Sequence, residues 1–488
     1  MGRYTVGIDL GTTNTLCCTF DNSFEFVKIK RGYLLPSVMM YKDGKITIGD
    51  MAKQRSLRLP ENIIASSKTF IGNFTKTWTI EDRHFDATDV AAEILTEVRL
   101  AAQKHFNTDG EIEAVITVPA YFSASQYDET KKAAERAGFK VINIISEPVA
   151  AAIACGFEDN VHSVFVIDIG GGTFDICLLN VENNGTKFET KCVDGDNQLG
   201  GDDFDQVIVQ MCYSQLRKEY GIDLSSVDKS GLDTDSFRQA LQKIAQKAEQ
   251  AKIALSDADE TDIEIANLCT KDGVPINFRF SVQRKAFETA AMPLFNKIKR
   301  IILRCLEDSN VDPKSIEKII FVGGSANIPH IKHIINDCFG QEAFADKDLS
   351  KLVSMGAALC AAQKNNLVST KLIIEDILSH SLGIRVVNDR LSIILPKGIK
   401  YPTKKVEKYT TVSDYQSDVL IEVYEGENID DINKDTKYGQ FVLSGIQSAL
   451  KGVPEILVTF EITQDRQLLV TAKDKQTGVT KTITIDKR

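Results

Sequence analysis

One short pattern occurs twice in this chain and constrains its fold more than any other feature. "VGIDLGTTNTLCC" begins at Val6, and "FVIDIGGGTFDIC" begins at Phe165. Both predict a strand, a glycine-rich turn and a second strand, with Asp9 and Asp168 at equivalent positions. Glycine weakens a strand, so its use in both turns needs another reason. We interpret the repeat as a duplicated α/β unit that binds one ligand between its halves.

Glycine-rich turns of this kind suit the binding of a polyphosphate. A glycine lets backbone N–H groups approach an anion without a Cβ in the way. Thr12, Thr13 and Thr173 add hydroxyl donors, and Asp9 and Asp168 can hold a hydrated Mg²⁺ ion, which takes few carboxylates. Tight packing alone would explain one such hairpin, but it explains two matching hairpins poorly. The chain has no GxxxxGK[ST] and no GxGxxG pattern, so the predicted nucleotide site is of another type.

Two further glycine pairs stand next to predicted helices. Gly200 and Gly201 precede a helix with acidic residues, and the amides of a helix start favour an anion. Gly323 and Gly324 lie between a strand and a helix, where a flat base can rest on bare peptide groups with Ser325 at its edge. Each pair is a weak signal alone, because such turns are common.

The hydrophobic pattern changes late in the chain. The earlier part mixes strands with long amphipathic helices, for example at 87–106. After Ile377 the segments alternate apolar and polar residues between turns, which is typical of an antiparallel β domain. We therefore predict an α/β region at 1–370, a linker at 371–376 ("KLIIED") and a β domain at 377–488.

Composition excludes several classes of protein. The 58 Lys and Arg against 68 Asp and Glu give a formal charge of −10, which argues against binding to nucleic acid or to acidic membranes. No apolar stretch approaches the roughly 18–20 residues of a membrane helix, and the first residues lack the pattern of an export signal. The ten cysteines form no CxxC pair and the six histidines do not cluster. We expect free thiols in a reducing cytoplasm and no zinc site.

A set of motifs spread over nearly the whole chain resembles the Hsp70 family of DnaK-type chaperones. It includes "GIDLGTTN", "VPAYF", "SEPVAAAIACG", "DIGGGTFD", "LGGDDFD", "AEQAKIALS", "VGGSANIP", "VLIEVYEGE", "GQFVLSGI" and "VTAKDKQTG". The resemblance implies an α/β actin-like ATPase domain of two lobes, a short linker and an all-β sandwich that binds extended peptides. It also implies a chaperone that hydrolyses ATP slowly, with ATP or ADP and Mg²⁺ as cofactors and K⁺ as a further ion.

The resemblance assigns roles in the ATPase domain residue by residue. Lys68 matches the lysine that contacts the γ-phosphate, and Glu147 matches the carboxylate near the attacking water. Asp9 and Asp168 match the aspartates that bind Mg²⁺ through water. The implied catalytic positions are Lys68, Glu147, Asp168 and Thr173. The implied nucleotide-binding positions are Gly11, Thr12, Thr13, Asn14, Gly170, Gly171, Gly172, Gly200, Gly201, Glu249, Lys252, Ser256, Gly323, Gly324 and Ser325.

Residue spacing supports one group of these assignments, whereas two others depend on the resemblance alone. Glu249, Lys252 and Ser256 follow an i, i+3, i+7 pattern, which places them on one face of the long helix predicted there. Taken without the resemblance, Lys68 is more typical of a solvated lysine. In the same way, Glu147 is more typical of an ordinary acid at a helix start.

In the β domain the resemblance implies peptide binding through backbone hydrogen bonds and apolar pockets. The implied peptide-binding positions are Ile384, Val387, Tyr409, Val412, Val419, Ile421 and Ile456. Val419 and Ile421 share one face of an alternating strand, so a place in the sandwich core explains them at least as well as a place in a cleft. The positions implied to couple the two domains are Pro119, Lys131 and Asp376.

The chain departs from the family pattern at several places. Asn327 replaces an arginine beside the adenine, so we expect weaker nucleotide binding. Tyr127 replaces an arginine of a proline–arginine relay, and Asn143 replaces an arginine associated with J-domain co-chaperones, with Ser146 nearby in place of asparagine. The family implies a J-domain co-chaperone and a nucleotide-exchange factor as partners, but Asn143 and Tyr127 count against them. The sequence stops at Arg488 without the family's helical lid, so we expect fast peptide exchange.

Two functions from different classes follow. The first is an ATP-dependent chaperone that controls its grip on extended peptide segments. The second is a nucleotide-gated scaffold or regulator that binds a dedicated partner with little ATP turnover, which the changes at Tyr127 and Asn143 favour. A small-molecule kinase or a filament protein on the same core is disfavoured by the C-terminal β domain. Peptide-stimulated ATP hydrolysis would separate the first two.

Overall fold

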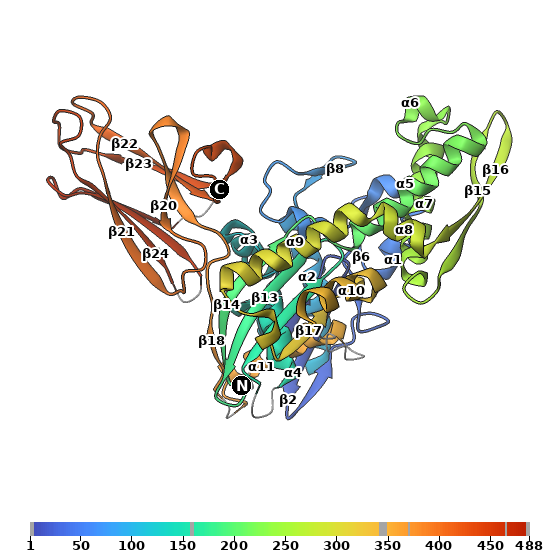
Figure 1. Cartoon of the computed structure of the whole chain (residues 1–488), viewed down its shortest axis with the longest axis horizontal. Helices are drawn as coiled ribbons and strands as arrows, with labels where there is room; N and C mark the ends of the chain where they lie inside the picture. Colours follow the sequence, from blue (N-terminus) through green and yellow to red (C-terminus); the bar gives the residue numbers. More distant parts are fainter. Residues whose placement is uncertain (1–3, 157–160, 341–348, 369–370, 464–465, 485–488) are drawn as a thin grey trace.

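The computed structural model describes residues 4–156, 161–340, 349–368, 371–463 and 466–484. Two lobes of mixed α/β structure are followed by a C-terminal β region, which lies beside the first and second lobes in Figure 1. None of the helices in these ranges is long and apolar enough to cross a membrane.

The first lobe is built on a sheet in which both strands of the first predicted hairpin are neighbours. Its strand order is β11-β10-β1-β2-β3, with β4 beside β2. The strands are β1 (Tyr4–Leu10), β2 (Asn14–Asp21), β3 (Ser23–Phe26), β4 (Leu35–Pro36), β10 (Ile112–Val118) and β11 (Lys140–Ser146). Antiparallel β2 and parallel β10 flank β1, and Asp9 ends up at the C-terminal end of β1.

The second lobe repeats this arrangement. Its strand order is β17-β12-β13-β14-β18. The strands are β12 (Ser163–Ile169), β13 (Phe174–Glu182), β14 (Lys187–Asp196), β17 (Lys318–Val322) and β18 (Ile373–Glu375). Antiparallel β13 and parallel β17 flank β12, with Asp168 opposite Asp175 at the turn. The prediction of two equivalent strand–turn–strand units is confirmed.

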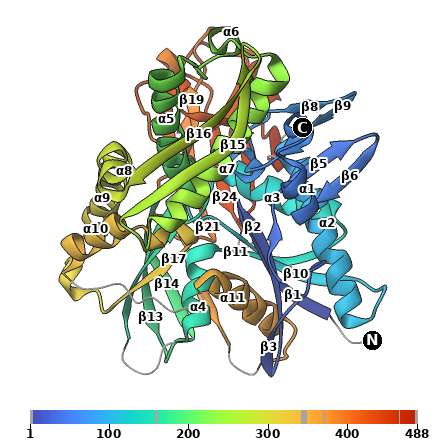
Figure 2. The ribbon, with the colours of Figure 1, turned by 90° about the vertical axis from the view of Figure 1, so that its right-hand side faces the viewer.

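Two helices lie between the sheets, as Figure 2 shows. They are α4 (Glu147–Cys155) and α11 (Leu349–Lys364). Small residues dominate α4 (Ala150, Ala151 and Ala152 are fully buried), so the helices approach closely, and Gly356 of α11 meets the Ala150 carbonyl. This alanine-rich layer packs on strands of both sheets, so it forms the base from which the two hairpins project.

The remaining helices and strands lie outside the two central sheets. In the first lobe these are α1 (Asp50–Arg55), α2 (Ala87–Phe106), α3 (Ala124–Arg136), β5 (Met39–Lys42), β6 (Lys45–Ile48), β7 (Ile63–Ile64), β8 (Trp78–Ile80) and β9 (Arg83–Phe85). In the second lobe they are α5 (Gly201–Tyr220), α6 (Val227–Ser230), α7 (Thr234–Ala254), α8 (Arg284–Ala290), α9 (Met292–Ser309), α10 (Pro329–Phe339), β15 (Glu260–Lys271) and β16 (Val274–Gln283).

Local signals explain where several helices begin and end. The predicted helix at 87–106 coincides with α2, which Asp86 starts with a capping box. Pro293 lies in the first turn of α9, where a backbone N–H would have no partner within the helix, so its absence costs nothing. The helical pattern is interrupted between α8 and α9 at Ala291. The helix predicted to reach Ser256 ends at Ala254.

The C-terminal region consists of two four-stranded antiparallel sheets, with orders β20-β19-β22-β23 and β21-β24-β25-β26. The strands are β19 (Leu382–Val386), β20 (Arg390–Leu395), β21 (Thr403–Tyr409), β22 (Asp418–Glu425), β23 (Thr436–Ser444), β24 (Ile456–Ile462), β25 (Leu468–Asp474) and β26 (Thr480–Thr484). Alternate residues of β24, such as Val458 and Phe460, are buried with Ile421 and Val423 of the other sheet. The apolar alternation predicted after Ile377 is confirmed.

The segment predicted as a linker is partly a strand. β18 pairs in parallel with β14, and Ile373 N–H donates to the Thr186 carbonyl at 2.8 Å. Lys187 and Lys400 contact the Glu375 carboxylate at 3.4 and 2.9 Å. The segment that joins the second lobe to the β region thus completes the second-lobe sheet.

Candidate functional site

The two glycine hairpins meet at a cavity of about 300 Å³ between the lobes. The tip of the second hairpin lies so close to the first lobe that a side chain added there would force a neighbouring threonine to move. A Cβ on Gly171 would lie 2.1 Å from Thr13 Oγ1, and one on Gly172 would lie 2.4 Å from Thr69 Cγ2. The cavity is lined from one side by Asp9, Gly11, Thr12, Thr13 and Asn14, and from the other by Asp168, Gly170, Gly171 and Thr173.

Lys68 and Glu147 form an ion pair in this cavity. Lys68 lies in a short 3-10 helix of the first lobe, and Glu147 begins α4. Their Nζ and Oε1 atoms are 2.6 Å apart, and both residues are 5% exposed. Burial alone would lower the pKa of Lys68, but the carboxylates of Glu147 and Asp9 raise it overall. The lysine therefore stays charged and carries a fixed positive charge into the cavity.

Three buried aspartates give this region an excess of acid. Burial, followed by the charge of Glu147, raises the pKa of Asp9 to about 7. The same two causes raise the pKa of Asp175 to about 7 and that of Asp168 well above its usual value. Carboxylates that are costly to ionise in this way favour a cation beside them. No group of three or more His, Cys, Asp or Glu with metal-binding geometry occurs in the described ranges.

The start of α5 closes the cavity on the second-lobe side. The N–H groups of Gly201 and Asp202 donate to the carbonyls of Gly170 and Gly171 at 2.9 and 2.7 Å. Lys252 of α7 donates to the Gly201 carbonyl and to Asp205 at 2.9 and 3.0 Å. Helix α5 and helix α7 are therefore tied directly to the second hairpin.

Two contacts cross between the lobes above the cavity, and the sequence did not indicate either. Ser66 Oγ donates to Asp202 Oδ2 at 2.6 Å, and Lys53 Nζ lies 3.5 Å from Glu249 Oε1. The acidic residues after Gly201 were the available signal for Asp202. Nothing local marks Lys53 or Ser66, because their partners belong to the other lobe.

Most of the predicted nucleotide positions line the cavity, but three do not. Glu249, Lys252, Gly201, Gly323, Gly324 and Ser325 line it together with the hairpin residues. Gly172 and Gly200 lie beside the second hairpin and are absent from the lining. Ser256 also does not line it, and it lies beyond the end of α7. The expected helix face of three residues is therefore wrong for Ser256, because the chain leaves the helix before that position.

The predicted peptide-binding positions fall into a buried and an exposed group. Ile384, Ile421 and Ile456 are at most 3% exposed and belong to the core between the two sheets. Val419 and Tyr409 are partly buried at the edge of that core. The other two are exposed: Val387, in a short 3-10 helix between β19 and β20, is 59% exposed, and Val412, in the loop after β21, is 61% exposed.

Polar contacts join the β region to the first lobe. Glu425 at the end of β22 accepts from the Ala124 N–H at 3.0 and 3.2 Å, at the N-terminus of α3, where a carboxylate is favoured. Tyr438 donates to Asp128 Oδ2 of the same helix at 2.5 Å, and Ser379 donates to the Phe122 carbonyl at 3.0 Å. Sequence reasoning missed these residues, because a glutamate or a tyrosine at a strand end carries no local signal of its partner.

The three predicted coupling positions lie near this contact. Pro119 is buried directly after β10. Lys131 of α3 lines a small pocket of about 70 Å³ with Tyr127 and Asn143. Asp376 accepts from the Tyr401 hydroxyl at 3.0 Å.

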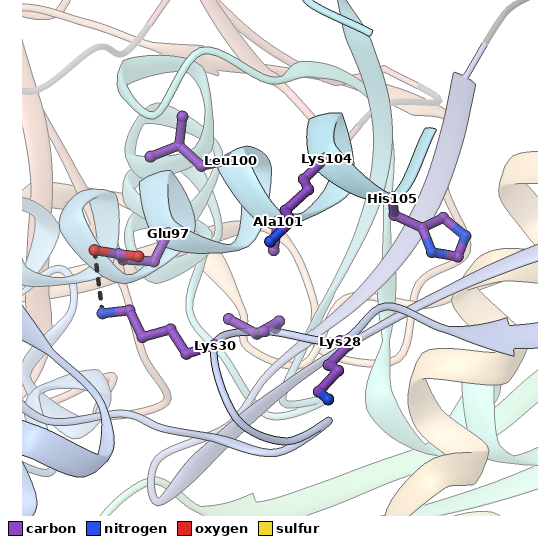
Figure 3. A pocket seen from close by; sticks show the side chains of 8 residues that line it. Lys28, Lys30, Glu97, Leu100, Ala101, Lys104 and His105 are labelled. Atoms are coloured by element: carbon purple, nitrogen blue, oxygen red, sulfur yellow. Dashed lines mark ion pairs between the residues drawn. The ribbon is translucent and has the colours of Figure 1, made fainter. Parts of the chain in front are cut away.

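A pocket of about 500 Å³ lies elsewhere, on the outer side of the first lobe. Figure 3 shows it between α2 and the segment around Lys28, with Lys30 directed toward Glu97 at 3.2 Å. None of the predicted site residues lines it. This pocket is larger than the cavity between the hairpins, but volume alone does not indicate a function. The cavity between the hairpins remains the candidate site.

Two duplicated α/β lobes that enclose paired glycine hairpins, buried aspartates and a lysine–glutamate pair define a nucleotide-binding protein with the architecture of an actin-like ATPase. A family model described as "Hsp70 protein" matches residues 5–488. The Chaperone protein DnaK of Thermotoga neapolitana is 35% identical over 488 residues, covering 98% of this chain and 79% of the relative. That of Thermosipho melanesiensis is 35% identical over 499 residues, covering 100% and 80%, and that of Halobacterium salinarum is 34% identical over 484 residues, covering 99% and 75%.

The chain belongs to the Hsp70 family. It is accordingly an ATP-dependent molecular chaperone with ATPase activity.

Proposed function

We propose that the chain binds ATP and Mg²⁺ in the cavity between the lobes and that hydrolysis controls how its β region binds extended peptide segments. The observation that carries this proposal is the Lys68–Glu147 pair at the meeting point of the two hairpins, 2.6 Å between Nζ and Oε1. Phosphoryl transfer needs positioning and charge neutralisation more than covalent chemistry. The buried Lys68 cation, held by a 3-10 helix, supplies charge neutralisation, and the buried Glu147 carboxylate at the start of α4 supplies positioning.

Each side chain has a role in this proposal. Lys68 neutralises charge that develops on the γ-phosphate, and Glu147 orients the attacking water. Thr12, Thr13 and Thr173 donate hydroxyl hydrogen bonds to phosphate oxygens, beside hairpin N–H groups that lack a Cβ in front of them.

The acidic residues of the cavity fit a magnesium ion. Asp9 and Asp168 are buried carboxylates with raised pKa values, so a divalent cation near them relieves their unfavourable ionisation. Two carboxylates are too few for direct coordination alone and match an ion that keeps its waters. The ion would hold the phosphates and neutralise their charge, and K⁺ is a further candidate ion for the same acidic region.

The division into domains supports a peptide-binding role for the β region. The core that contains α4 and α11 extends to Ile377, and the core of the two antiparallel sheets starts at Leu378 and takes in one first-lobe residue, Ala124 of α3. We assign the nucleotide-binding domain to 1–370, the linker to 371–376 and the substrate-binding domain to 377–488. Val387 and Val412 are exposed apolar residues in the connections between strands, and they are the first candidates to contact an unfolded peptide.

The proposal also covers the partners of the chain and the compartment in which it acts. Unfolded or extended polypeptide is the proposed substrate. A J-domain co-chaperone and a nucleotide-exchange factor are proposed with the reservation that Asn143 and Tyr127 depart from the family pattern. All ten cysteines are free thiols, which supports action in a reducing cytoplasm.

The test is single-turnover ATP hydrolysis in the presence of Mg²⁺, with and without an unstructured apolar peptide. We expect Lys68→Ala to lower the hydrolysis rate by about a hundredfold or more while ATP still binds, because one electrostatic contact to the transition state is lost. Lys45→Ala, an exposed lysine of the same lobe, is the matched control and should hydrolyse ATP as the wild type does. Unchanged hydrolysis in Lys68→Ala would refute the assigned site. A flat, negligible rate in the wild type with tight ATP binding would favour the scaffold instead.

A further inference from the structure

Arg466 occupies an unusual place for an arginine. It lies in the turn between β24 and β25, where its N–H donates to the Thr463 carbonyl at 3.0 Å. Its φ of 61° is in the left-handed region that favours glycine. The residue is only 6% exposed, although arginine is rarely buried without a partner. A strained backbone that directs a charged side chain inward points to a specific role for that side chain.

The guanidinium lies among groups from both sides of the contact between the β region and the first lobe. Its carbon is 5.2 Å from the ring centroid of Tyr127 on α3 and 5.8 Å from that of Tyr401. Nη2 donates to Ser379 Oγ at 3.1 Å, and Ser379 donates in turn to the Phe122 carbonyl at 3.0 Å. The arginine thus touches an aromatic ring on each side of the contact and a hydrogen bond that crosses it.

We propose that Arg466 is a positioning residue that clamps the C-terminal β region onto helix α3. A guanidinium over an aromatic ring is attracted by the ring's negative face, and the attraction is strongest where water is excluded. Tyr127 is 6% exposed, so this contact is largely dry. Contact with two rings at once suits the broad, weakly hydrated guanidinium of arginine better than the ammonium of lysine, which is compact and strongly hydrated.

The clamp is connected to one strand of each lobe, β11 in the first lobe and β18 in the second. The Tyr127 hydroxyl donates to the Ile144 carbonyl of β11 at 3.1 Å, and β11 leads directly into Glu147. The Tyr401 hydroxyl donates to Asp376, the residue after β18. Release of Arg466 should therefore loosen β18 from the second-lobe sheet. Any effect of this release on the ATP cycle rests on the proposed function.

The test compares Arg466→Gly with the wild type by hydrogen–deuterium exchange of the nucleotide-free protein. Glycine fits the left-handed turn, so this variant removes the side chain without adding backbone strain. We expect the amides of 373–375 to exchange about tenfold faster, which corresponds to about 1.4 kcal/mol, while the amides of β24 and β25 keep their protection. Lys473→Ala, an exposed cation of the same hairpin, should match the wild type. Equal protection of 373–375 in Arg466→Gly and the wild type would overturn the clamp.

Two further variants separate positioning from general stability. Tyr127→Phe keeps the ring and should retain most of the protection, whereas Tyr127→Leu should lose it. Combined with Arg466→Gly, Tyr127→Leu should add little, because both changes remove the same contact. Full additivity would overturn the proposal. If protection of β24 and β25 also falls in Arg466→Gly and Arg466→Lys is no better, the side chain serves only the hairpin and the proposal fails.

The exchange experiment does not depend on ATP hydrolysis, so it distinguishes the two proposals. A wild type that hydrolyses no ATP, with β18 released in Arg466→Gly, would refute the proposed function and leave the clamp standing. Normal ATP hydrolysis in the wild type, together with unchanged protection of β18 in Arg466→Gly, would refute the clamp and leave the proposed function standing.

Discussion

His380 is a single residue whose charge state depends on the contact between the β region and the first lobe. Its Nε2 lies 3.0 Å from the Tyr121 carbonyl, and the two rings are 4.3 Å apart. Burial, followed by the charges of Lys397 and Arg466, lowers the pKa of His380 to about 4, although the Tyr121 carbonyl and Asp194 oppose this. The imidazole is therefore neutral at pH 7, with its proton on the nitrogen that donates to Tyr121.

This shift predicts a pH dependence of stability. An unfolded histidine has a pKa near 6.5, so between about pH 6.5 and 4 the unfolded state binds more protons than the folded state. The free energy of unfolding should fall as the pH drops through this range. In urea titrations from pH 7 to 4.5, we expect the wild type to lose roughly 2–3 kcal/mol more than His380→Gln, which keeps a donor but does not titrate.

The matched control for this titration is His333→Gln, because His333 is an exposed histidine of α10. It should lose stability with pH as the wild type does. Equal losses for the wild type and His380→Gln would show that His380 does not carry the effect.

At the scale of an element, β18 shows how a connecting segment becomes part of a sheet. Its three residues add a parallel edge strand to β14, and the Ile373 side chain is 38% exposed. Ile373 is therefore held more by backbone pairing than by side-chain burial, whereas Ile374 also packs against the core that contains α4 and α11. The ion contacts of Glu375 with Lys187 and Lys400 are partly exposed and add little to its stability.

Ile373→Pro tests this account of β18. Proline removes the N–H that donates to the Thr186 carbonyl. We expect hydrogen exchange at 187–189 to rise by about tenfold or more, since a lost ladder bond and the backbone clash together cost more than ~1.4 kcal/mol. Ile373→Ala keeps the N–H and should stay within about threefold of the wild type. Similar exchange in the two variants would mean that side-chain burial holds the strand instead.

At the scale of the whole molecule, the cavity exists only while the two lobes stay close. The hairpins touch at Gly171 and Thr13, and Ser66 bonds across to Asp202 at 2.6 Å. Neither lobe encloses this cavity alone. The shared layer of α4 and α11 sets the distance between the lobes, because small side chains let those helices and the flanking sheets pack tightly.

Gly171→Ala should disturb this arrangement. The added Cβ would lie 2.1 Å from Thr13 Oγ1, so the lobes must separate or Thr13 must turn away from the cavity. We expect ATP affinity, measured by calorimetry, to fall by at least about tenfold, or ~1.4 kcal/mol. Gly32→Ala, whose Cβ would meet nothing closer than 3.9 Å, should bind ATP normally. Unchanged affinity in Gly171→Ala would show that nucleotide binding does not need this close approach.

The sequence by itself determined the features that depend on near neighbours in the chain. The two strand–glycine–strand units, the helix at 87–106 and the alternating strands after Ile377 all follow from apolar spacing and turn residues. The hairpin residues of the cavity could be named because they lie at the ends of those strands, where a turn must expose them, whereas Lys68 and Glu147 were named only through the family resemblance.

Only the tertiary structure decided which distant residues meet. Lys68 and Glu147 pair across 79 residues, β18 joins a sheet, and Arg466 reaches Tyr127. An alternating strand such as β24 shows which face is apolar, but a second sheet closing over that face is what buries Ile456. Contacts of this kind depend on how whole helices and sheets pack. The residues next to either partner in the sequence do not indicate which distant residue it will contact.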